Sequence, residues 1–233
     1  DRAELFSAAP WAGGGPTGTF VPFRETDLRA PVEPGKILCV GRNYAAHAKE
    51  LGNEVPAEPL LFLKPRSALV GHGGAVELPP ESARVEHEAE LGVVIGKSAR
   101  RVSRESALDH VFGYTCVCDV TARDLQKKDG QWSRAKGFDT FCPCGPWIET
   151  SVDPRGLRVR GVVNGVARQD GSTAQMIFDV PTLIEYASRA MTLEAGDLLV
   201  TGTPEGVGPL AAGDTLTVDI ESIGALTVTV RSA

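Results

Sequence analysis

Short apolar runs, several of them alternating with polar residues, dominate the chain from about residue 36 onward. A strand points successive side chains to opposite faces, so these runs predict β-strands. We expect strands or strand pairs at residues 36–41, 59–65, 89–97, 111–120, 157–170, 197–204 and 214–232. In one of these segments the dipeptide Asn164-Gly165 supplies the positive φ angles that a tight hairpin turn requires.

Two segments have a helical pattern. Residues 43–52 end at Gly52, and residues 180–191 carry Pro181, which is tolerated in a first helical turn. Strands nevertheless outnumber helices, and the regular βαβα alternation of a doubly wound fold is missing from the pattern. The sequence therefore predicts a β-rich α+β fold with a mixed or antiparallel sheet.

The first part of the chain has a different character. Residues 1–34 contain the turn-rich stretches "AGGGPTG" and "RAPVEPG" and show little periodicity. A chain of 233 residues fits one large domain with an appendage better than two equal domains. We therefore expect a short N-terminal extension at residues 1–34 and one main domain at residues 35–233. The first residue is Asp1 and not Met, so the sequence leaves open what precedes it.

The stretch "EHEAELGVVIG" places Glu86, Glu88 and Glu90 at alternate positions directly before an apolar run. On a strand the three carboxylates would share one face. One interpretation is a solvated edge. The other is a hard divalent cation, which binds carboxylate oxygens and relieves their repulsion where the strand enters a buried sheet. This stretch alone does not decide between the two.

Composition and charge narrow the range of functions. The net charge is −6 and the pI is near 5.3, without a Lys- or Arg-rich run, so nothing indicates nucleic acid or an anionic membrane as a partner. No apolar run approaches the ~20 residues that a membrane span needs, and the N-terminus lacks a secretory signal pattern. A small-molecule substrate is the default expectation.

The cysteines indicate a reducing compartment. The sequence has five, an odd number, and they include two C-x-C pairs: Cys39, Cys116, Cys118, Cys142 and Cys144. This spacing is not typical of a secreted disulfide framework, and structural zinc sites favour a C-x₂₋₄-C spacing. We expect reduced core cysteines and a cytoplasmic protein.

A further metal ligand is available in "YTCVCDVTARDLQ". If alternate residues of this strand pack inward, Asp119 emerges on the opposite face, just before Thr121-x-x-Asp124, which has the form of a capping box and could begin a helix. In that helix Arg123 and Gln126 would share a face, and Lys136 follows in "RAKGFD". The side chains of Arg123, Gln126 and Lys136 could donate hydrogen bonds to a carboxylate or enolate oxygen beside a metal. An ordinary turn aspartate and an amphipathic helix remain the alternatives.

Two other features have both an ordinary and a functional interpretation. His47 and Glu50 are spaced i, i+3 in a predicted helix, so the carboxylate can hold the imidazole for general-base work, although a lone helical histidine is more often structural.

The loop "VTGTPEGVGP" lacks the phosphate-binding pattern G-x-x-x-x-G-K-[ST]. It is either a turn between strands or a loop whose backbone N–H groups and Thr203 hydroxyl hold a carboxylate.

Six ordered motifs together resemble one family. The motifs "GRNYAAHAKELGNE", "LFLKP", "EHEAELGVVIGK", "GYTCVCDVTARDLQ", "AKGFDTFCPCGPWI" and "VTGTPEGVGP" are similar to those of the fumarylacetoacetate hydrolase family, especially its acylpyruvase and oxaloacetate decarboxylase branch. The resemblance covers roughly residues 36–230 and implies the mixed β-sandwich roll of that family's C-terminal domain. It implies that residues 35–233 are the catalytic domain and that the protein is a homodimer. Many relatives carry a longer N-terminal β-domain than residues 1–34 could form.

The resemblance also implies roles for the candidate residues. Glu88, Glu90 and Asp119 would hold Mg²⁺ or Mn²⁺, with Ca²⁺ as a possible occupant, and Glu86 would be a neighbour of this site rather than a ligand. Arg123, Gln126 and Lys136 would contact the substrate, and Lys136 would also be catalytic. His47 and Glu50 would activate water, and Thr203 would bind a carboxylate.

These roles imply a Mg²⁺-dependent hydrolase or decarboxylase that cleaves C–C bonds in short 2-oxo (β-dicarbonyl) acids, such as acylpyruvates or oxaloacetate, through a metal-stabilised enolate. One alternative is an isomerase of the 2-hydroxyhepta-2,4-diene-1,7-dioate type, as in aromatic-acid degradation. The pair His47 and Glu50 favours hydrolysis, because keto-enol tautomerisation needs no activated water. A second alternative is a non-catalytic module that binds a metal and a carboxylate.

Overall fold

Two curled β-sheets form the body of the protein, and the computed structural model describes residues 2–233. The strands are β1 (Arg2–Phe6), β2 (Pro16–Pro22), β3 (Ile37–Gly41), β4 (Leu60–Lys64), β5 (Leu69–Val70), β6 (Ala75–Leu78), β7 (Val85–His87), β8 (Ala89–Ile95), β9 (Val111–Cys118), β10 (Thr121–Ala122), β11 (Cys142–Glu149), β12 (Arg158–Val163), β13 (Val166–Ser172), β14 (Leu198–Val200), β15 (Gly208–Pro209), β16 (Thr215–Ile220) and β17 (Gly224–Ser232). The α-helices are α1 (Ala45–Glu50), α2 (Arg123–Asp129), α3 (Ser133–Gly137) and α4 (Val180–Ala190).

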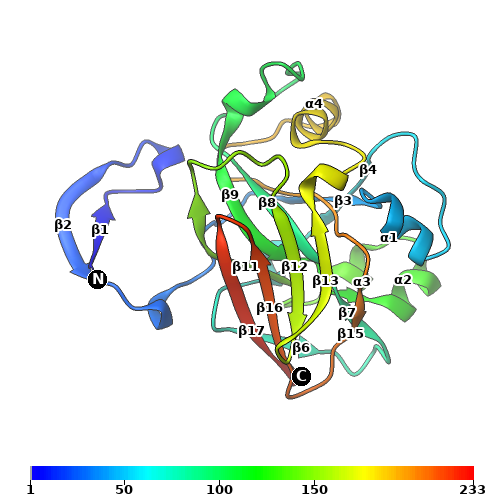
Figure 1. Cartoon of the computed structure of the whole chain (residues 1–233). Helices are drawn as coiled ribbons and strands as arrows, with labels where there is room; N and C mark the ends of the chain where they lie inside the picture. The colour runs from blue at the N-terminus through cyan, green and yellow to red at the C-terminus, as the bar shows by residue number, and fades with distance from the viewer. Residues whose placement is uncertain (1) are drawn as a thin grey trace.

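The larger sheet has the strand order β4-β3-β14-β8-β9-β11-β5, and it is mixed because β3 and β14 run parallel while β8 and β9 run antiparallel. A five-stranded sheet of order β13-β12-β16-β17-β6 lies against it, as Figure 1 shows. The main core lies between them and includes Leu91 and Cys116 from one sheet and Val159 and Leu216 from the other. The predicted β-rich α+β class is confirmed.

The larger sheet is apolar on both faces, as the apolar run after Glu90 indicated. Leu91 and Val93 face the main core, whereas Val94 packs with Leu198 and Val200 in a second buried cluster. All five cysteines are buried and free, and they are divided between these two clusters. Each thiol therefore serves as a small apolar side chain of the core.

The predicted hairpin and helices are present. Asn164 and Gly165 have φ angles of 52° and 77° and connect β12 to β13. Helix α4 begins after Asp179, whose carboxylate accepts a hydrogen bond from the backbone N–H of Thr182. None of the helices in residues 2–233 has the length and apolar character needed to cross a membrane.

Two local expectations were wrong. Thr121 does not cap a helix: it belongs to β10, where it pairs with Glu86, and its hydroxyl donates to the Asp119 carbonyl oxygen. Helix α2 starts after Ala122 without a side-chain cap, and Asp124 instead accepts hydrogen bonds from the segment before β7. The glutamate stretch is also not one strand, because the chain leaves the small sheet β10-β7-β15 at Glu88 and enters the larger sheet at β8.

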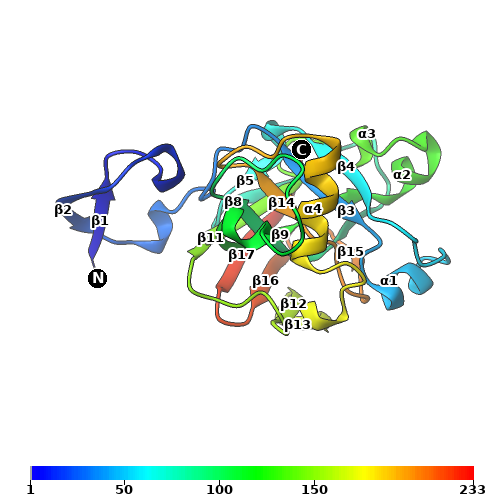
Figure 2. The ribbon, with the colours of Figure 1, turned by 90° about the horizontal axis from the view of Figure 1, so that it is seen from above.

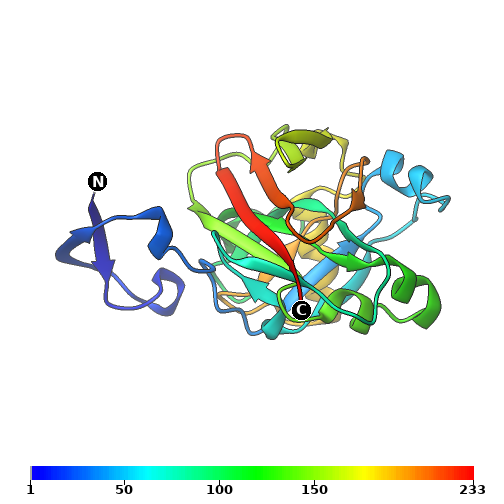
Figure 3. The same cartoon turned by 90° about the horizontal axis from the view of Figure 1, so that it is seen from below.

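The N-terminal residues and the three short helices lie at opposite ends of the molecule. Strands β1 and β2 form a separate two-stranded sheet that projects from the body, as Figures 1 and 3 show. Trp11, in the loop between them, packs edge-on against Phe112 with ring centroids 5.1 Å apart. Figure 2 shows α1, α2 and α3 gathered at the far end, on the side of the edge strand β4 and its neighbour β3.

Candidate active site

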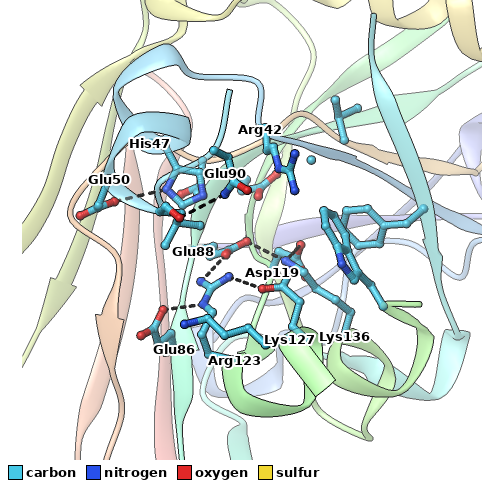
Figure 4. A pocket seen from close by; sticks show the side chains of 18 of the residues that line it. Arg42, His47, Glu50, Glu86, Glu88, Glu90, Asp119, Arg123, Lys127 and Lys136 are labelled. Atoms are coloured by element: carbon cyan, nitrogen blue, oxygen red, sulfur yellow. Dashed lines mark hydrogen bonds and ion pairs between the residues drawn. The ribbon is translucent and has the colours of Figure 1, made fainter. Parts of the chain in front are cut away.

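A pocket of about 560 Å³ opens between α1, α2 and α3 at the ends of β3, β7 and β8. All nine residues for which the sequence indicated a role line it, as Figure 4 shows for most of them: His47, Glu50, Glu88, Glu90, Asp119, Arg123, Gln126, Lys136 and Thr203. They come from five separate segments of the chain. The fold therefore brings the candidate residues together in one place.

Three acids converge at the base of the pocket. Oxygen atoms of Glu88, Glu90 and Asp119 lie within 4.8 Å of one another, and all three residues are buried. The antiparallel pairing of β8 with β9 produces this arrangement, because it sets Ala89 opposite Cys118 and lets the Asp119 N–H donate to the Glu88 carbonyl oxygen at 2.9 Å. Glu88 and Asp119 thus occupy neighbouring positions where the two strands end.

Two buried lysines balance part of this negative charge. Lys136 Nζ lies 2.8 Å from Glu88 Oε2 and 2.6 Å from Asp119 Oδ2, so it bridges the two acids. Lys64 Nζ lies 2.5 Å from Asp119 Oδ1 and also donates to the Val120 carbonyl oxygen. The sequence interpretation assigned no role to Lys64. The feature that could have identified Lys64 is its place in "LFLKP", where a single charged residue ends an otherwise apolar strand.

Arg123 is held in a network of its own. Its guanidinium donates to Glu86 at 2.7 Å, to Glu88 at 2.6 Å and to Gln126 at 2.8 Å. Glu86 receives a second hydrogen bond, from Arg84 at 2.6 Å. The first of the three alternating glutamates is therefore neutralised by two arginines and stands apart from the acid cluster.

The surroundings shift the pKa values of Glu88 and Glu90 in opposite directions. Burial alone would raise the pKa of Glu88, but Lys136 and Arg123 outweigh it and hold this pKa well below its usual range. Burial, together with the charges of Asp119 and Glu88, raises the pKa of Glu90 well above its usual value. Among the residues that the structure describes, no lysine or arginine pairs with Glu90, whose Oε2 accepts from the Gly202 N–H.

This donor set fits a hard divalent cation. Three carboxylates offer oxygen ligands from one side, and the excess negative charge at Glu90 is what a cation would relieve. Cysteine and histidine, which softer metals prefer, contribute nothing to the cluster of three. A buried acid triad that could hold a metal is thus present.

His47 and Glu50 border the same pocket from α1. His47 Nδ1 lies 3.3 Å from Glu50 Oε2, and the other oxygen of Glu50 accepts from the Gly206 N–H at 3.0 Å. His47 is buried, whereas Glu50 is exposed. The carboxylate can therefore orient the imidazole, with the loop after β14 holding the carboxylate in turn.

Thr203 lies on that loop, but its hydroxyl is already engaged. The hydroxyl donates to the Ala89 carbonyl oxygen at 2.8 Å and accepts from the Gln169 side chain at 2.7 Å. Gln169 also contacts His87, whose pKa is lowered by burial. These contacts fix the loop against β8 and leave the Thr203 hydroxyl engaged within the protein.

Comparison with known proteins identifies the family of the chain. Residues 36–231 match the family model described as fumarylacetoacetate (FAA) hydrolase, C-terminal. The chain is 50% identical over 188 residues to the mitochondrial oxaloacetate decarboxylase of Dictyostelium discoideum, covering 78% of this chain and 86% of the relative. It is 47% identical over 217 residues to the oxaloacetate tautomerase YisK of Bacillus subtilis, covering 87% and 72%.

Solved structures of related enzymes superpose closely. A crystal structure of 2-hydroxyhepta-2,4-diene-1,7-dioate isomerase from Mycobacterium marinum has a TM-score of 0.91 and 45% identity and covers 99% of this chain and 88% of that chain. Fumarylpyruvate hydrolase from Pseudomonas aeruginosa, solved in complex with Mn²⁺ and pyruvate, has a TM-score of 0.80 and 35% identity, with 93% of each chain covered.

Proposed function

The chain belongs to the fumarylacetoacetate hydrolase family, and from this premise we propose that it is a divalent-metal-dependent enzyme that cleaves C–C bonds in short 2-oxo acids. Acylpyruvates and oxaloacetate are the substrates that we favour. One observation carries the proposal: the buried cluster of Glu88, Glu90 and Asp119 shares a pocket with the pair formed by His47 and Glu50. Residues 35–233 would be the catalytic domain and residues 1–34 a short extension, because every residue that lines the pocket lies beyond residue 35.

We assign Mg²⁺ or Mn²⁺ to Glu88, Glu90 and Asp119. When bound there, the cation would supply a Lewis acid that polarises the keto oxygen of a 2-oxo acid. The presence of Mn²⁺ and pyruvate in the related fumarylpyruvate hydrolase supports this pairing of metal and ligand. The opposing pKa shifts of Glu88 and Glu90 support it from this chain itself, since Glu90 lacks a cationic partner among the residues described.

In hydrolysis, His47 acts as the general base. Glu50 accepts a hydrogen bond from Nδ1–H, so Nε2 is the acceptor that removes a proton from water. The water oxygen adds to the distal carbonyl carbon of an acylpyruvate, and the C–C bond on the side of the 2-oxo acid then breaks. A carboxylate and pyruvate are the products, and the proton taken up by His47 completes the methyl group of pyruvate.

Lys136 stabilises the negative charge that develops on the substrate. Its ammonium has three N–H donors, of which two are engaged by Glu88 and Asp119. The third is available for the 2-oxo oxygen or the adjacent carboxylate. The two acids also raise the pKa of Lys136 despite its burial, so the side chain stays protonated and acts as a donor. Arg123 acts by orienting Glu88 and Gln126.

Oxaloacetate decarboxylation needs the same charge stabilisation but no attacking water, and one relative has the name oxaloacetate decarboxylase, whereas two have the name oxaloacetate tautomerase. An isomerase remains the second candidate, because a neighbour with a TM-score of 0.91 has that name and a buried imidazole can relay a proton between carbon and oxygen. A module that binds metal and carboxylate without turnover is the third.

The test is to assay acetylpyruvate, oxaloacetate and a 2-hydroxy-2,4-diene-1,7-dioate side by side with Mg²⁺, with Mn²⁺ and with excess chelator. We expect metal-dependent cleavage of acetylpyruvate or oxaloacetate. Conversion of the diene alone would favour the isomerase. Ligand binding without turnover of any of the three would favour the non-catalytic module.

A further inference from the structure

Arg42 lines the pocket without a carboxylate partner. The other buried or half-buried cations at the site are neutralised: Arg123 by Glu86 and Glu88, and Lys136 by Glu88 and Asp119. Across residues 2–233, no acid lies within ion-pair distance of the Arg42 guanidinium, which is half-buried at the pocket wall. An arginine in this position has five N–H donors without a protein anion to receive them.

The backbone holds Arg42 in a costly conformation. Its φ angle is +60°, in the left-handed region that residues with a Cβ rarely adopt. The next residue, Asn43, fixes this turn because its side chain donates to the carbonyl oxygens of Phe178 and Thr201 and accepts from the Phe178 N–H. The surrounding contacts therefore determine the turn, and the side chain of Arg42 projects from it into the pocket (Figure 4).

An aromatic wall links Arg42 to the acid cluster. The Arg42 guanidinium carbon lies 6.0 Å from the centre of the Trp132 ring, and Lys136 Nζ lies at the same distance of 6.0 Å from it. Trp132 is fixed in turn by an edge-on contact with Phe62 and by Gly41, where an added Cβ would come within 2.8 Å of the indole. One ring thus lies near both the charge-stabilising lysine and the unpaired arginine.

We propose that Arg42 binds the second, distal carboxylate of a 2-oxo dicarboxylate whose 2-oxo acid end lies at Lys136 and the acid cluster. This inference rests on the proposed function and deepens it by naming dicarboxylates as the preferred substrate class. Arg123 cannot serve in this way without giving up Glu86 and Glu88. The planar guanidinium of Arg42 can donate two parallel hydrogen bonds to the two oxygens of a carboxylate.

Lys127 provides an internal comparison. It also lines the pocket and forms no ion pair with any residue in the described range 2–233. Its side chain is exposed on α2, and Figure 4 shows it on the far side of Glu88 and Asp119 from Arg42. A flexible, hydrated ammonium attracts anions without fixing their geometry. Lys127→Gln therefore removes one positive charge from the pocket and leaves the proposed contact intact.

The experiment compares Arg42→Gln, Arg42→Lys and Lys127→Gln with the wild type on oxaloacetate and on acetylpyruvate, whose distal end is uncharged. Gln and Lys carry the same left-handed penalty as Arg, so unfolding temperature and Mg²⁺ affinity are expected to stay unchanged. For Arg42→Gln we expect kcat/KM for oxaloacetate to fall by about 10- to 100-fold and that for acetylpyruvate by less than about 3-fold. For Arg42→Lys we expect kcat/KM for oxaloacetate to lie between the values for the wild type and for Arg42→Gln. Lys127→Gln should change kcat/KM for each substrate by less than about 3-fold.

Two results would overturn the inference while the proposed function stands. An equal loss on both substrates would mean that Arg42 acts on their common 2-oxo acid end. An equal selective loss in Lys127→Gln would mean that a general positive field, rather than a built contact, selects dicarboxylates.

Binding supplies a readout that does not depend on turnover. With Mg²⁺ present, calorimetry would compare 2-oxoglutarate, a stable dicarboxylate, with 2-oxobutyrate, which has a single carboxylate. We expect the wild type to prefer 2-oxoglutarate by about 10-fold or more and Arg42→Gln to lose that preference. If the wild type turns over neither assay substrate, the proposed function fails, yet an Arg42-dependent preference would still support the site. If the wild type binds 2-oxoglutarate no better than 2-oxobutyrate, the proposed role of Arg42 is refuted.

Discussion

Lys64 and Asp119, 55 residues apart in the chain, form a fully buried ion pair in which Nζ and Oδ1 are 2.5 Å apart. Lys136 contacts the other oxygen of Asp119, so the carboxylate lies between two lysines. This arrangement gives the acid cluster a fixed geometry, because each oxygen of Asp119 has one cationic neighbour. It also makes the site dependent on a residue that touches neither the pocket nor the other two acids.

We expect Lys64→Met to lower the free energy of unfolding by about 3–5 kcal/mol, because the change leaves buried negative charge with one fewer partner. Chemical denaturation in the presence of a chelator measures this loss. Lys49→Met, at an exposed position on α1, is the control and should change the value by less than about 0.5 kcal/mol. A Lys64 variant as stable as this control would show that the pair contributes little.

Glu90→Gln should have opposite effects on metal binding and on stability. The variant removes one proposed ligand, so we expect Mg²⁺ affinity to fall by at least about 100-fold in calorimetry. It also removes a carboxylate whose pKa burial, Asp119 and Glu88 raise, so the metal-free protein should melt at a higher temperature. Glu86→Gln is the matched control, since Glu86 pairs with two arginines, and its ion affinity should stay within a few-fold of wild type. Equal losses in both variants would contradict the assignment of the site.

His47→Ala should separate hydrolysis from decarboxylation. Loss of the general base is expected to slow hydrolysis of acetylpyruvate by about 10²- to 10⁴-fold and to leave Mg²⁺ affinity nearly unchanged. Decarboxylation of oxaloacetate requires no attacking water and should suffer less. Rates for both substrates and an ion titration of the same variant provide the check. Loss of metal binding would instead identify His47 as a ligand.

The buried thiols should resist labelling in the folded protein. Burial raises the pKa of Cys116 and Cys142 to about 12 from the ordinary value of 9.0, so the reactive thiolate is scarce at neutral pH. Because the folded pKa exceeds the unfolded one, this contribution to stability is present below about pH 9 and is lost as the pH rises toward 12. Thermal melts between pH 7 and 10 and thiol titration with and without denaturant test both points. Fewer than five thiols in denaturant, or stoichiometric zinc, would count against reduced, metal-free cysteines.

We expect the protein to be a homodimer. The edge strand β4 exposes Leu60 and Leu63, and the projecting hairpin exposes Leu5, Phe6 and Phe20. Sedimentation at micromolar concentration should give about twice the chain mass of 24.7 kDa. A monomer at that concentration would contradict the prediction and would leave these apolar side chains in water.

Local signals indicated candidate residues for the site, and the resemblance to a family chose between their ordinary and functional interpretations. The alternation of Glu86, Glu88 and Glu90 and the i, i+3 spacing of His47 and Glu50 follow from the periods of strand and helix, which neighbouring residues determine. Where a local rule competed with pairing between distant segments, the local rule failed. Thr121 had the form of a helix cap, yet pairing with β7 drew it into a strand.

The sequence by itself determined the β-rich class, the positions of the main strands and helices, and most of the candidate site residues, but it gave no role to Lys64 or Arg42. Tertiary structure alone decided how charge is shared among them. It paired Glu86 with two arginines, gave Glu88 an arginine and a lysine, and left Glu90 with a backbone N–H as its partner. The physical reason is that ion pairing and desolvation depend on distance and burial in space, and three glutamates at identical spacing carry no information about which cation the fold brings beside each.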